Sequence, residues 1–164
     1  MNTTTKPGDE TLLSIPGSWH ISYNYAAGYT ASRFFLALRD EEKILATRCP
    51  SCARTLLPPR SYCDRCFRAC ETWCEVGPEG SVVAFTVCYR RSPGIDREPP
   101  FMIALIRLDG ADTNLIHVLE GCDMTQPEAI LNQVRAGLRV RPEFRPRDKR
   151  VGQILDIECF RVLA

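Results

Sequence analysis

The sequence has almost no net charge and no long apolar run, and each absence excludes a class of protein. Its 164 residues carry 21 Lys and Arg against 20 Asp and Glu, whereas a dedicated nucleic-acid-binding domain is usually strongly basic. No apolar stretch approaches the roughly 18 residues that span a bilayer. Residues 1–13 lack a basic stretch followed by an apolar one, so we expect no secretory signal, no membrane association and a cytoplasmic location.

Signatures of catalysis are also scarce. The sequence has only two histidines and contains no GxGxxG, Walker, HExxH or GxSxG motif. It is too short for a catalytic barrel of about 250 residues. A nucleophilic cysteine needs a base within reach, and the one pair to consider is Cys88 with His117, facing each other across a barrel. A core cysteine and a surface histidine are favoured instead, so we predict no catalytic residue.

What the sequence has in abundance is cysteine, with nine in all. In a cytoplasmic protein, clustered cysteines bind metal more often than they form disulfides. Two C-x2-C pairs, Cys49 with Cys52 and Cys63 with Cys66, are separated by ten residues. Four thiolates are the usual ligands of a tetrahedral structural zinc ion. We therefore predict one structural Zn²⁺ bound by these four cysteines, with iron in a rubredoxin-like site as the alternative metal.

The other five cysteines have less distinctive positions. Cys70 and Cys74 follow Cys66 at intervals of four, so on a helix the three would form one stripe, and Cys70 or Cys74 could enter a competing ligand set. Thiolates four apart on a helix do not make the knuckle turn, which favours small buried apolar residues instead. The remaining three lie in or beside predicted strands: Cys88, Cys122 and Cys159.

Before the cysteines, the sequence predicts a loose arm and an amphipathic helix over 30–42. Dense aromatic residues outside a clear core are often an interface feature, and an amphipathic helix must lie against another surface. We therefore predict a partner interface formed by Trp19, Tyr23, Tyr25, Phe34, Phe35 and Leu38. The alternative is that these side chains cover the domain's own core.

After the cysteines, residue patterns predict five strands with one helix-like insert. The strands are expected over 81–91, 101–109, 113–121, 137–146 and 151–164, and the insert over 125–134. Pro142 makes the fourth strand look like an edge strand. This number and rhythm of strands is typical of a Greek-key barrel of the OB type, with an SH3-like barrel or a small sandwich as alternatives. The predicted domains are 1–46, arm and helix; 47–75, zinc ribbon; and 76–164, OB-fold barrel.

Several short motifs in a fixed order resemble the acyl-CoA-associated zinc-ribbon and OB-fold family, the small partners of thiolases, aldolases and related condensing enzymes. The motifs are CPSC at 49–52, LLPPRSYCDRC at 56–66, Trp73 leading to Gly80, LDGA at 108–111, and Gly137 before a strand. The resemblance covers about 34–144. The sequence departs from the family at Ala53, where glycine is usual, and at Leu138, where methionine is common.

The resemblance implies a mostly β fold with N-terminal helices, a rubredoxin-like zinc ribbon and a five-stranded OB-fold barrel. It also implies a non-catalytic accessory subunit of a heteromeric thiolase-like acyl-CoA enzyme, which supports assembly and acyl-CoA handling. Some members accompany thiolases of aromatic degradation, such as benzoylsuccinyl-CoA thiolase, and others accompany synthases, steroid side-chain aldolases or acyltransferases. We therefore expect a hetero-oligomer with such a partner.

Two further hypotheses concern ligands. Zinc ribbons and OB barrels both bind nucleic acids, so a single-stranded nucleic-acid-binding module is the alternative function, although the near-neutral charge predicts no nucleic acid. The phosphates of CoA need cationic contacts, which the ribbon and a basic run over 135–150 could supply. The residues proposed for these contacts are Arg60, Arg65, Arg139 and Arg141. Such a basic run is more often a solvated face.

Overall fold

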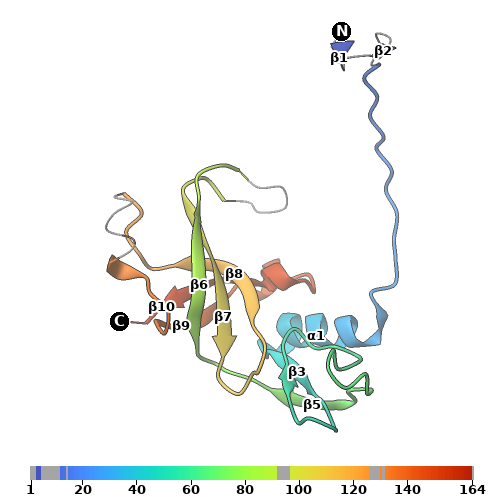
Figure 1. Ribbon diagram of the computed structural model, residues 1–164, viewed down its shortest axis with the longest axis vertical. Coiled ribbons are helices and arrows are strands. Elements are labelled where there is room, and N and C mark those ends of the chain that lie inside the picture. Colours follow the sequence, from blue (N-terminus) through green and yellow to red (C-terminus); the bar gives the residue numbers. More distant parts are fainter. Residues whose placement is uncertain are drawn as a thin grey trace.

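The computed structural model describes residues 3–4, 12–13, 15–91, 97–125, 130 and 132–163. Along the chain, a short hairpin of β1 (Thr3–Thr4) and β2 (Leu12–Leu13) precedes an open arm, one helix, a three-stranded sheet and a barrel. Figure 1 shows the arm leading away from the body of the molecule at the beginning of the helix. None of the described helices is long and apolar enough to cross a membrane.

The helix α1 (Gly28–Glu41) packs one face on the barrel. Phe34, Ala37 and Leu38 are its buried residues, and Phe34 and Leu38 belong to the same apolar core as the barrel interior. The helix ends where Glu42 adopts a left-handed conformation and donates its N–H to the carbonyl of Ala37. The resemblance implied several N-terminal helices, but the described residues before the ribbon form this one.

The ribbon is a three-stranded antiparallel sheet in the order β4-β3-β5. Its strands are β3 (Leu45–Arg48), β4 (Thr55–Leu56) and β5 (Thr72–Glu75). A helical stripe of cysteines would require residues 66–71 to be helical. Instead, these residues form turns and an isolated bridge. The helical alternative for Cys66, Cys70 and Cys74 is therefore wrong, because β5 places Cys74 in a strand.

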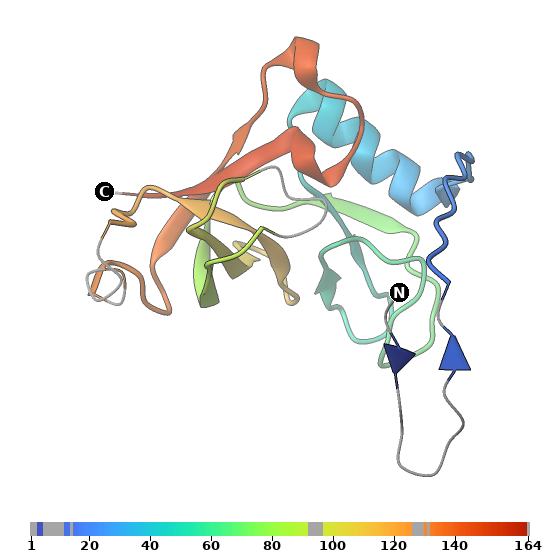
Figure 2. The same ribbon diagram turned by 90° about the horizontal axis from the view of Figure 1, so that it is seen from above.

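The C-terminal part is a closed barrel in the order β10-β8-β7-β6-β9. The strands are β6 (Gly80–Cys88), β7 (Phe101–Leu108), β8 (Leu115–Glu120), β9 (Arg139–Phe144) and β10 (Ile157–Val162). Only β8 and β10 pair in parallel. The first three strands form a meander, and the fifth joins the third to the fourth, which is the OB connectivity. The predicted fold class is confirmed, and closure of the barrel excludes an open sandwich. Figure 2 shows α1 beside the segment between β9 and β10.

The prediction that β9 is an edge strand is wrong. It pairs with β10 over Val140 to Phe144 and with β6 through Val140 and Arg139. The pairing of β9 with β6 stops at Val140, so β9 has no strand partner on that side at Pro142. Proline is therefore tolerated at this position although the barrel is closed. The predicted insert over 125–134 lies largely outside the described residues; within it, Ile130 and Val134 are buried in the core.

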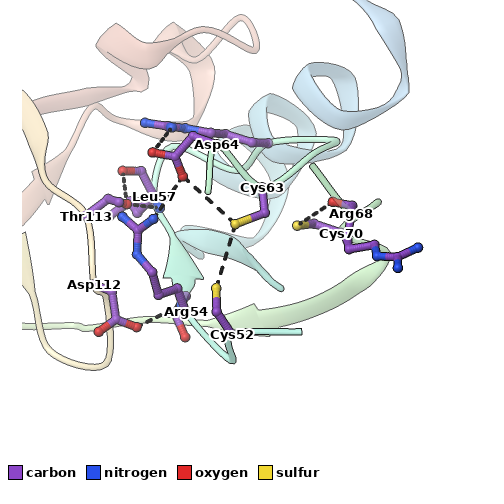
Figure 3. A network of polar contacts seen from close by, with 11 residues as sticks. Cys52, Arg54, Leu57, Cys63, Asp64, Arg68, Cys70, Asp112 and Thr113 are labelled. Atoms are coloured by element: carbon purple, nitrogen blue, oxygen red, sulfur yellow. Dashed lines mark hydrogen bonds and ion pairs between the residues drawn. The ribbon is translucent and has the colours of Figure 1, made fainter. Parts of the chain in front are cut away.

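Hydrogen bonds join the ribbon to the barrel through the β7–β8 turn. The hydroxyl of Thr113 accepts the N–H of Leu57 at 2.6 Å and donates to its carbonyl at 2.8 Å. The carboxylate of Asp112 accepts the N–H of Thr55 at 2.8 Å, and the N–H of Asp112 donates to the carbonyl of Thr55 at 2.9 Å. The turn therefore acts as a short additional pairing partner of β4 (Figure 3).

Part of the basic run is structural rather than solvated. The side chain of Arg150 is only 7% exposed and pairs with Glu42. It also donates to the carbonyl of Arg39 at the end of α1, at 3.2 Å, and to that of Arg145, at 2.6 Å. Arg150 thus links the helix to the segment between β9 and β10.

Candidate metal centre and the surface beside it

The two C-x2-C pairs converge on one point. The Sγ atoms of Cys49, Cys52, Cys63 and Cys66 all lie within 4.8 Å of one another, and the Sγ atoms of Cys52 and Cys63 are 3.7 Å apart (Figure 3). Among the described residues, these four form the group of His, Cys, Asp and Glu able to hold a metal ion. Four sulfur donors fit a tetrahedral zinc ion with no position left for water or substrate, which is the pattern of a structural site.

Each cysteine pair is held by the same backbone turn. The N–H of Cys49 donates to the carbonyl of Arg54 and that of Ala53 to Cys49, at 2.9 and 3.0 Å. The second turn repeats this pattern at the same distances, from Cys63 to Arg68 and from Phe67 to Cys63. Both turns contain a residue with positive φ, 58° at Ala53 and 51° at Phe67.

The left-handed turns explain why glycine is usual after the first pair in the resembling family. An L-residue with a Cβ adopts this conformation only at a cost of about 1–2 kcal/mol. In this chain Ala53 adopts it nevertheless, because the converging cysteines and the backbone hydrogen bonds require the turn. The departure at Ala53 therefore leaves the knuckle geometry intact.

An ion-pair cluster ties the two turns together. Arg54, which follows the first pair, contacts Asp64 of the second turn at 2.9 Å, and Arg60 contacts the same carboxylate at 3.4 Å. Burial raises the pKa of Asp64, but the positive charge of Arg54, its hydrogen bond and the charge of Arg60 lower it more, so the net shift is downward. Asp64 therefore stays ionised next to the thiolates and fixes both arginines.

Cys70 packs beside the metal centre without belonging to it. It is buried in a small cluster with Cys49, Leu56 and Cys63. Its Sγ lies 3.6 Å from the carbonyl of Arg68. Burial raises the pKa of the Cys70 thiol, and the nearby Cys49 and Cys63 raise it further. A protonated, buried thiol suits the packing role expected for this residue.

Cys88 and His117, the one pair considered as nucleophile and base, lie apart in the structure. His117 was predicted on the surface, but it is 5% exposed: its ring contacts Phe160 edge-on inside the barrel, and burial lowers its pKa. Its neighbour on β7 is Ala104, whereas that of Cys88 is Phe101. Because these two neighbours are three residues apart, the sheet directs Cys88 and His117 to opposite faces, and they form no pair.

The predicted interface residues separate into two groups. Trp19, Tyr23 and Tyr25 are exposed on the arm, whereas Phe34 and Leu38 are buried in the chain's own core. The two helix residues are therefore unavailable to a partner, because the barrel already covers that face of α1. Phe35 is half-buried and packs against the same core.

The structure adds an exposed set that sequence reasoning did not include. Around α1 and the ribbon, Tyr29, Leu36, Tyr62 and Phe67 are exposed, and Phe67 is 81% exposed. Trp73 of β5 lies beside α1: the guanidinium of Arg33 is 4.5 Å from its ring centroid, and Tyr29 meets it edge-on at 6.5 Å. We call Tyr29, Arg33, Tyr62, Phe67 and Trp73 the aromatic surface.

The residues of the aromatic surface other than Phe67 line two clefts. One, of 630 Å³, lies between α1 and the edge of the ribbon sheet, and the other, of 440 Å³, lies beside Tyr62. Tyr29, Arg33 and Trp73 line both clefts. Tyr29 and Arg33 lie on α1 and Trp73 lies on β5, so no local sequence pattern reveals all three. Only the spacing of Tyr29 and Arg33, one helical turn apart, is a signal in the sequence.

The four arginines proposed as phosphate contacts lie in two places, the loop between β4 and β5 and the strand β9. Arg60 precedes the second cysteine turn and is engaged by Asp64, whereas Arg65 lies within that turn and is exposed. On β9, Arg139 binds Asp109 at 2.6 Å and Glu79 at 3.0 Å, whereas Arg141 is exposed. The two engaged arginines would have to leave an ion pair to reach a phosphate.

A third cleft, of 380 Å³, lies at the end of the barrel between β7 and β8. Its lining includes Phe101, Met102, Leu119 and Met124, with Arg97 at its edge. Arg97 contacts Glu120 at 2.7 Å. The lining is mostly apolar with one ion pair. It combines the start of β7, the end of β8 and the residues beside them, which lie about 20 residues apart in the sequence, so no local pattern indicated it.

Comparison with known proteins gives two adjoining family matches. Residues 37–72 match the ChsH2 rubredoxin-like zinc ribbon domain, and residues 73–145 match the ChsH2 C-terminal OB-fold domain. The matches together contain the four converging cysteines and the barrel strands β6 to β9.

Two solved structures share the fold. A protein of unknown function from the DUF35 family of Sulfolobus solfataricus is 27% identical, with a TM-score of 0.57, over 82% of this chain and 84% of that chain. The Ltp2-ChsH2(DUF35) aldolase is 20% identical, with a TM-score of 0.57, over 84% of this chain and 98% of that chain. At 20% identity, the second likeness concerns the fold alone.

Proposed function

The chain belongs to the ChsH2-type family of zinc-ribbon and OB-fold proteins, and on this premise we propose that it is a non-catalytic accessory subunit of a heteromeric acyl-CoA enzyme. The partner is a thiolase-like, aldolase or related condensing subunit. A similar structure carries the name of an aldolase that combines Ltp2 with ChsH2, which supports this class of partner. The proposal also agrees with a metal centre that leaves no coordination position for chemistry.

The observation that carries the proposal is the aromatic surface beside the metal centre. Tyr, Trp and Arg are the residues most enriched at the energetic centres of protein interfaces, and here they lie together on α1 and the ribbon. Tyr62 and Phe67 flank Cys63 and Cys66, so the metal would hold them in place. We infer that zinc contributes to partner binding indirectly, by fixing the turn that presents Tyr62 and Phe67.

Acyl-CoA handling has weaker but separate support. The cleft at the end of the barrel offers an apolar lining for an acyl chain, and Arg97 at its edge offers a cation for an anionic group. For the phosphates of CoA we retain Arg60, Arg65, Arg139 and Arg141 as proposed contacts. Arg65 and Arg141 are the better candidates because they are exposed, whereas Arg60 and Arg139 are held by carboxylates.

The test is co-expression with a thiolase- or aldolase-like protein from the same genome. We expect one complex of defined stoichiometry in light-scattering measurements, and acyl-CoA turnover that requires both chains. The double variant Tyr62→Ala with Phe67→Ala should weaken the complex by at least about tenfold. Tyr89→Ala is the matched control, because Tyr89 is also exposed but directly follows β6 of the barrel.

Two outcomes would contradict the proposal. One is that the chain remains monomeric when it is co-expressed with the thiolase- or aldolase-like protein, and turns over an acyl-CoA without it. The other is tight, salt-sensitive binding of single-stranded oligonucleotides at physiological salt, which would support the nucleic-acid alternative instead.

A further inference from the structure

The arm that precedes α1 has a regular pattern that the proposed function leaves unaccounted for. Trp19, Ile21, Tyr23 and Tyr25 occupy every second position, and His20, Ser22 and Asn24 lie between them. The four large side chains are 66–86% exposed. Strict alternation of aromatic or β-branched residues with polar residues over seven positions is the signature of a strand with one buried face.

The arm has this strand pattern but no strand partner. Residues 15–27 contain no helix or strand, and the segment 15–26, which precedes the N-cap Ala27 of α1, makes no backbone hydrogen bond among the described residues. Figure 1 shows this segment as an open chain that leaves the body at α1. The rings of Tyr23 and Tyr25 are 6.3 Å apart, as expected for residues i and i+2 on the same side of an extended chain.

Neither a disordered linker nor a docking helix fits the arm as well as a strand does. A disordered linker is typically poor in aromatic and β-branched residues, whereas this segment is rich in them. A helix that docks in a groove places its anchors three and four residues apart, and positions 19, 21, 23 and 25 would be spread around such a helix. Exposure of four large apolar side chains is unfavourable in water, so the pattern calls for a surface that buries one face of an extended chain.

A second copy of this chain offers no suitable edge in the described residues. The barrel is closed, and the stretches that its register leaves unpaired on one side, such as 141–144 of β9 and 83–88 of β6, are shorter than the seven-residue segment. The ribbon sheet has two edges, β4 with two residues and β5 with four, and both are shorter than the seven-residue segment. The edge that accepts this arm therefore belongs to a different protein.

We propose that residues 19–25 add as an edge strand to a sheet of the partner subunit, with Trp19, Ile21, Tyr23 and Tyr25 filling apolar pockets on one face. This inference rests on the proposed function, because the acceptor is the thiolase- or aldolase-like subunit. The acceptor needs an exposed strand edge with apolar side chains on the face that meets the four anchors. Backbone hydrogen bonds would supply affinity, and the alternating pockets would supply specificity.

The test uses the full-length chain and measures the dissociation constant of its complex with the partner subunit. Alanine at position 19, 21, 23 or 25 should weaken binding by about tenfold or more, whereas alanine at 20, 22 or 24 should change it less than about twofold. All seven side chains are in an exposed segment, so melting temperature and zinc content should match wild type. A helical or absent periodicity of the effects would overturn the inference.

Amide hydrogen exchange in the complex gives a second readout. An edge strand is paired on one side only, so every second amide of 19–25 should become protected when the partner binds. Protection of none of these amides would also overturn the inference.

If wild type binds the partner and the arm variants bind equally well, only this inference fails. If wild type does not bind, the proposed function fails with it. A dimer of the chain alone that the anchor variants abolish would assign the arm to a second copy.

Discussion

The contact between Thr113 and the ribbon can be tested by the substitution Thr113→Val. Valine keeps the shape of the side chain but removes the hydroxyl that accepts the N–H of Leu57 at 2.6 Å and donates to its carbonyl at 2.8 Å. Leu57 is fully buried, so both backbone groups would be left without a partner. Each unsatisfied buried group costs about 1–3 kcal/mol, and Thr113 is half-buried, so we expect a loss of about 2–4 kcal/mol.

The assay is thermal and urea unfolding in zinc-containing buffer, followed by circular dichroism, with zinc content measured per chain. For a chain of this size, the expected loss lowers Tm by roughly 5–15 °C. Thr86→Val is the control with the same chemical change, because Thr86 lies in β6 but is exposed; it should change stability by less than about 0.5 kcal/mol. If Thr113→Val behaves like this control and keeps its zinc, the ribbon is not coupled to the barrel through this turn, and the reasoning is refuted.

Three further predictions concern the metal centre and the barrel. Cys63→Ser removes one of four converging thiols, so it should lower the bound zinc below one per chain and unfold the ribbon; unchanged zinc stoichiometry by atomic spectroscopy would exclude Cys63 as a ligand. Ala53→Gly removes the strain of an L-residue at a φ of 58°, so it should stabilise the protein by about 1 kcal/mol and raise Tm. The control Ala31→Gly in α1 should destabilise the protein by about the same amount, and equal effects of the two substitutions would contradict the strain argument. Burial lowers the pKa of His117 below 6.5, so the unfolded chain binds more protons, and stability should fall as pH drops below about 6.5; a His117→Leu variant should show a weaker pH dependence of Tm between about pH 5 and 8, and an identical profile would remove His117 as the cause.

The metal centre and the strands could be predicted because their signals are local. Two cysteines separated by two residues turn back toward one point whatever surrounds them, and the apolar run over 101–108, rich in Ile and Leu, marks a buried strand. Pairing between strands that are far apart in the sequence could not be predicted in the same way. Pro142 marked β9 as an edge strand, but the barrel closes through Val140 and Arg139, and nothing within the strand records that contact.

The sequence indicated which residues are apolar, but not which of them are buried within this chain. The apolar face of α1 was recognised, but whether Phe34 and Leu38 would face a partner or the chain's own core depended on where the barrel lies. His117 was expected on the surface, yet the register of β8 against β7 turns it inward beside Phe160. The aromatic surface was missed because Tyr29, Arg33 and Trp73 meet only when α1 and β5 are placed side by side.

By itself, the sequence determined the ligand set of the ribbon, the order of the elements and the class of barrel, because residue spacing and alternation act over a few residues. The tertiary structure alone decided which apolar faces are already covered, which arginines are held by carboxylates, and which aromatic side chains remain exposed. Those outcomes depend on contacts between segments far apart in the chain. The arm over 19–25 combines both levels: its alternation is visible in the sequence, and only the fold shows that the described part of this chain leaves it without a partner.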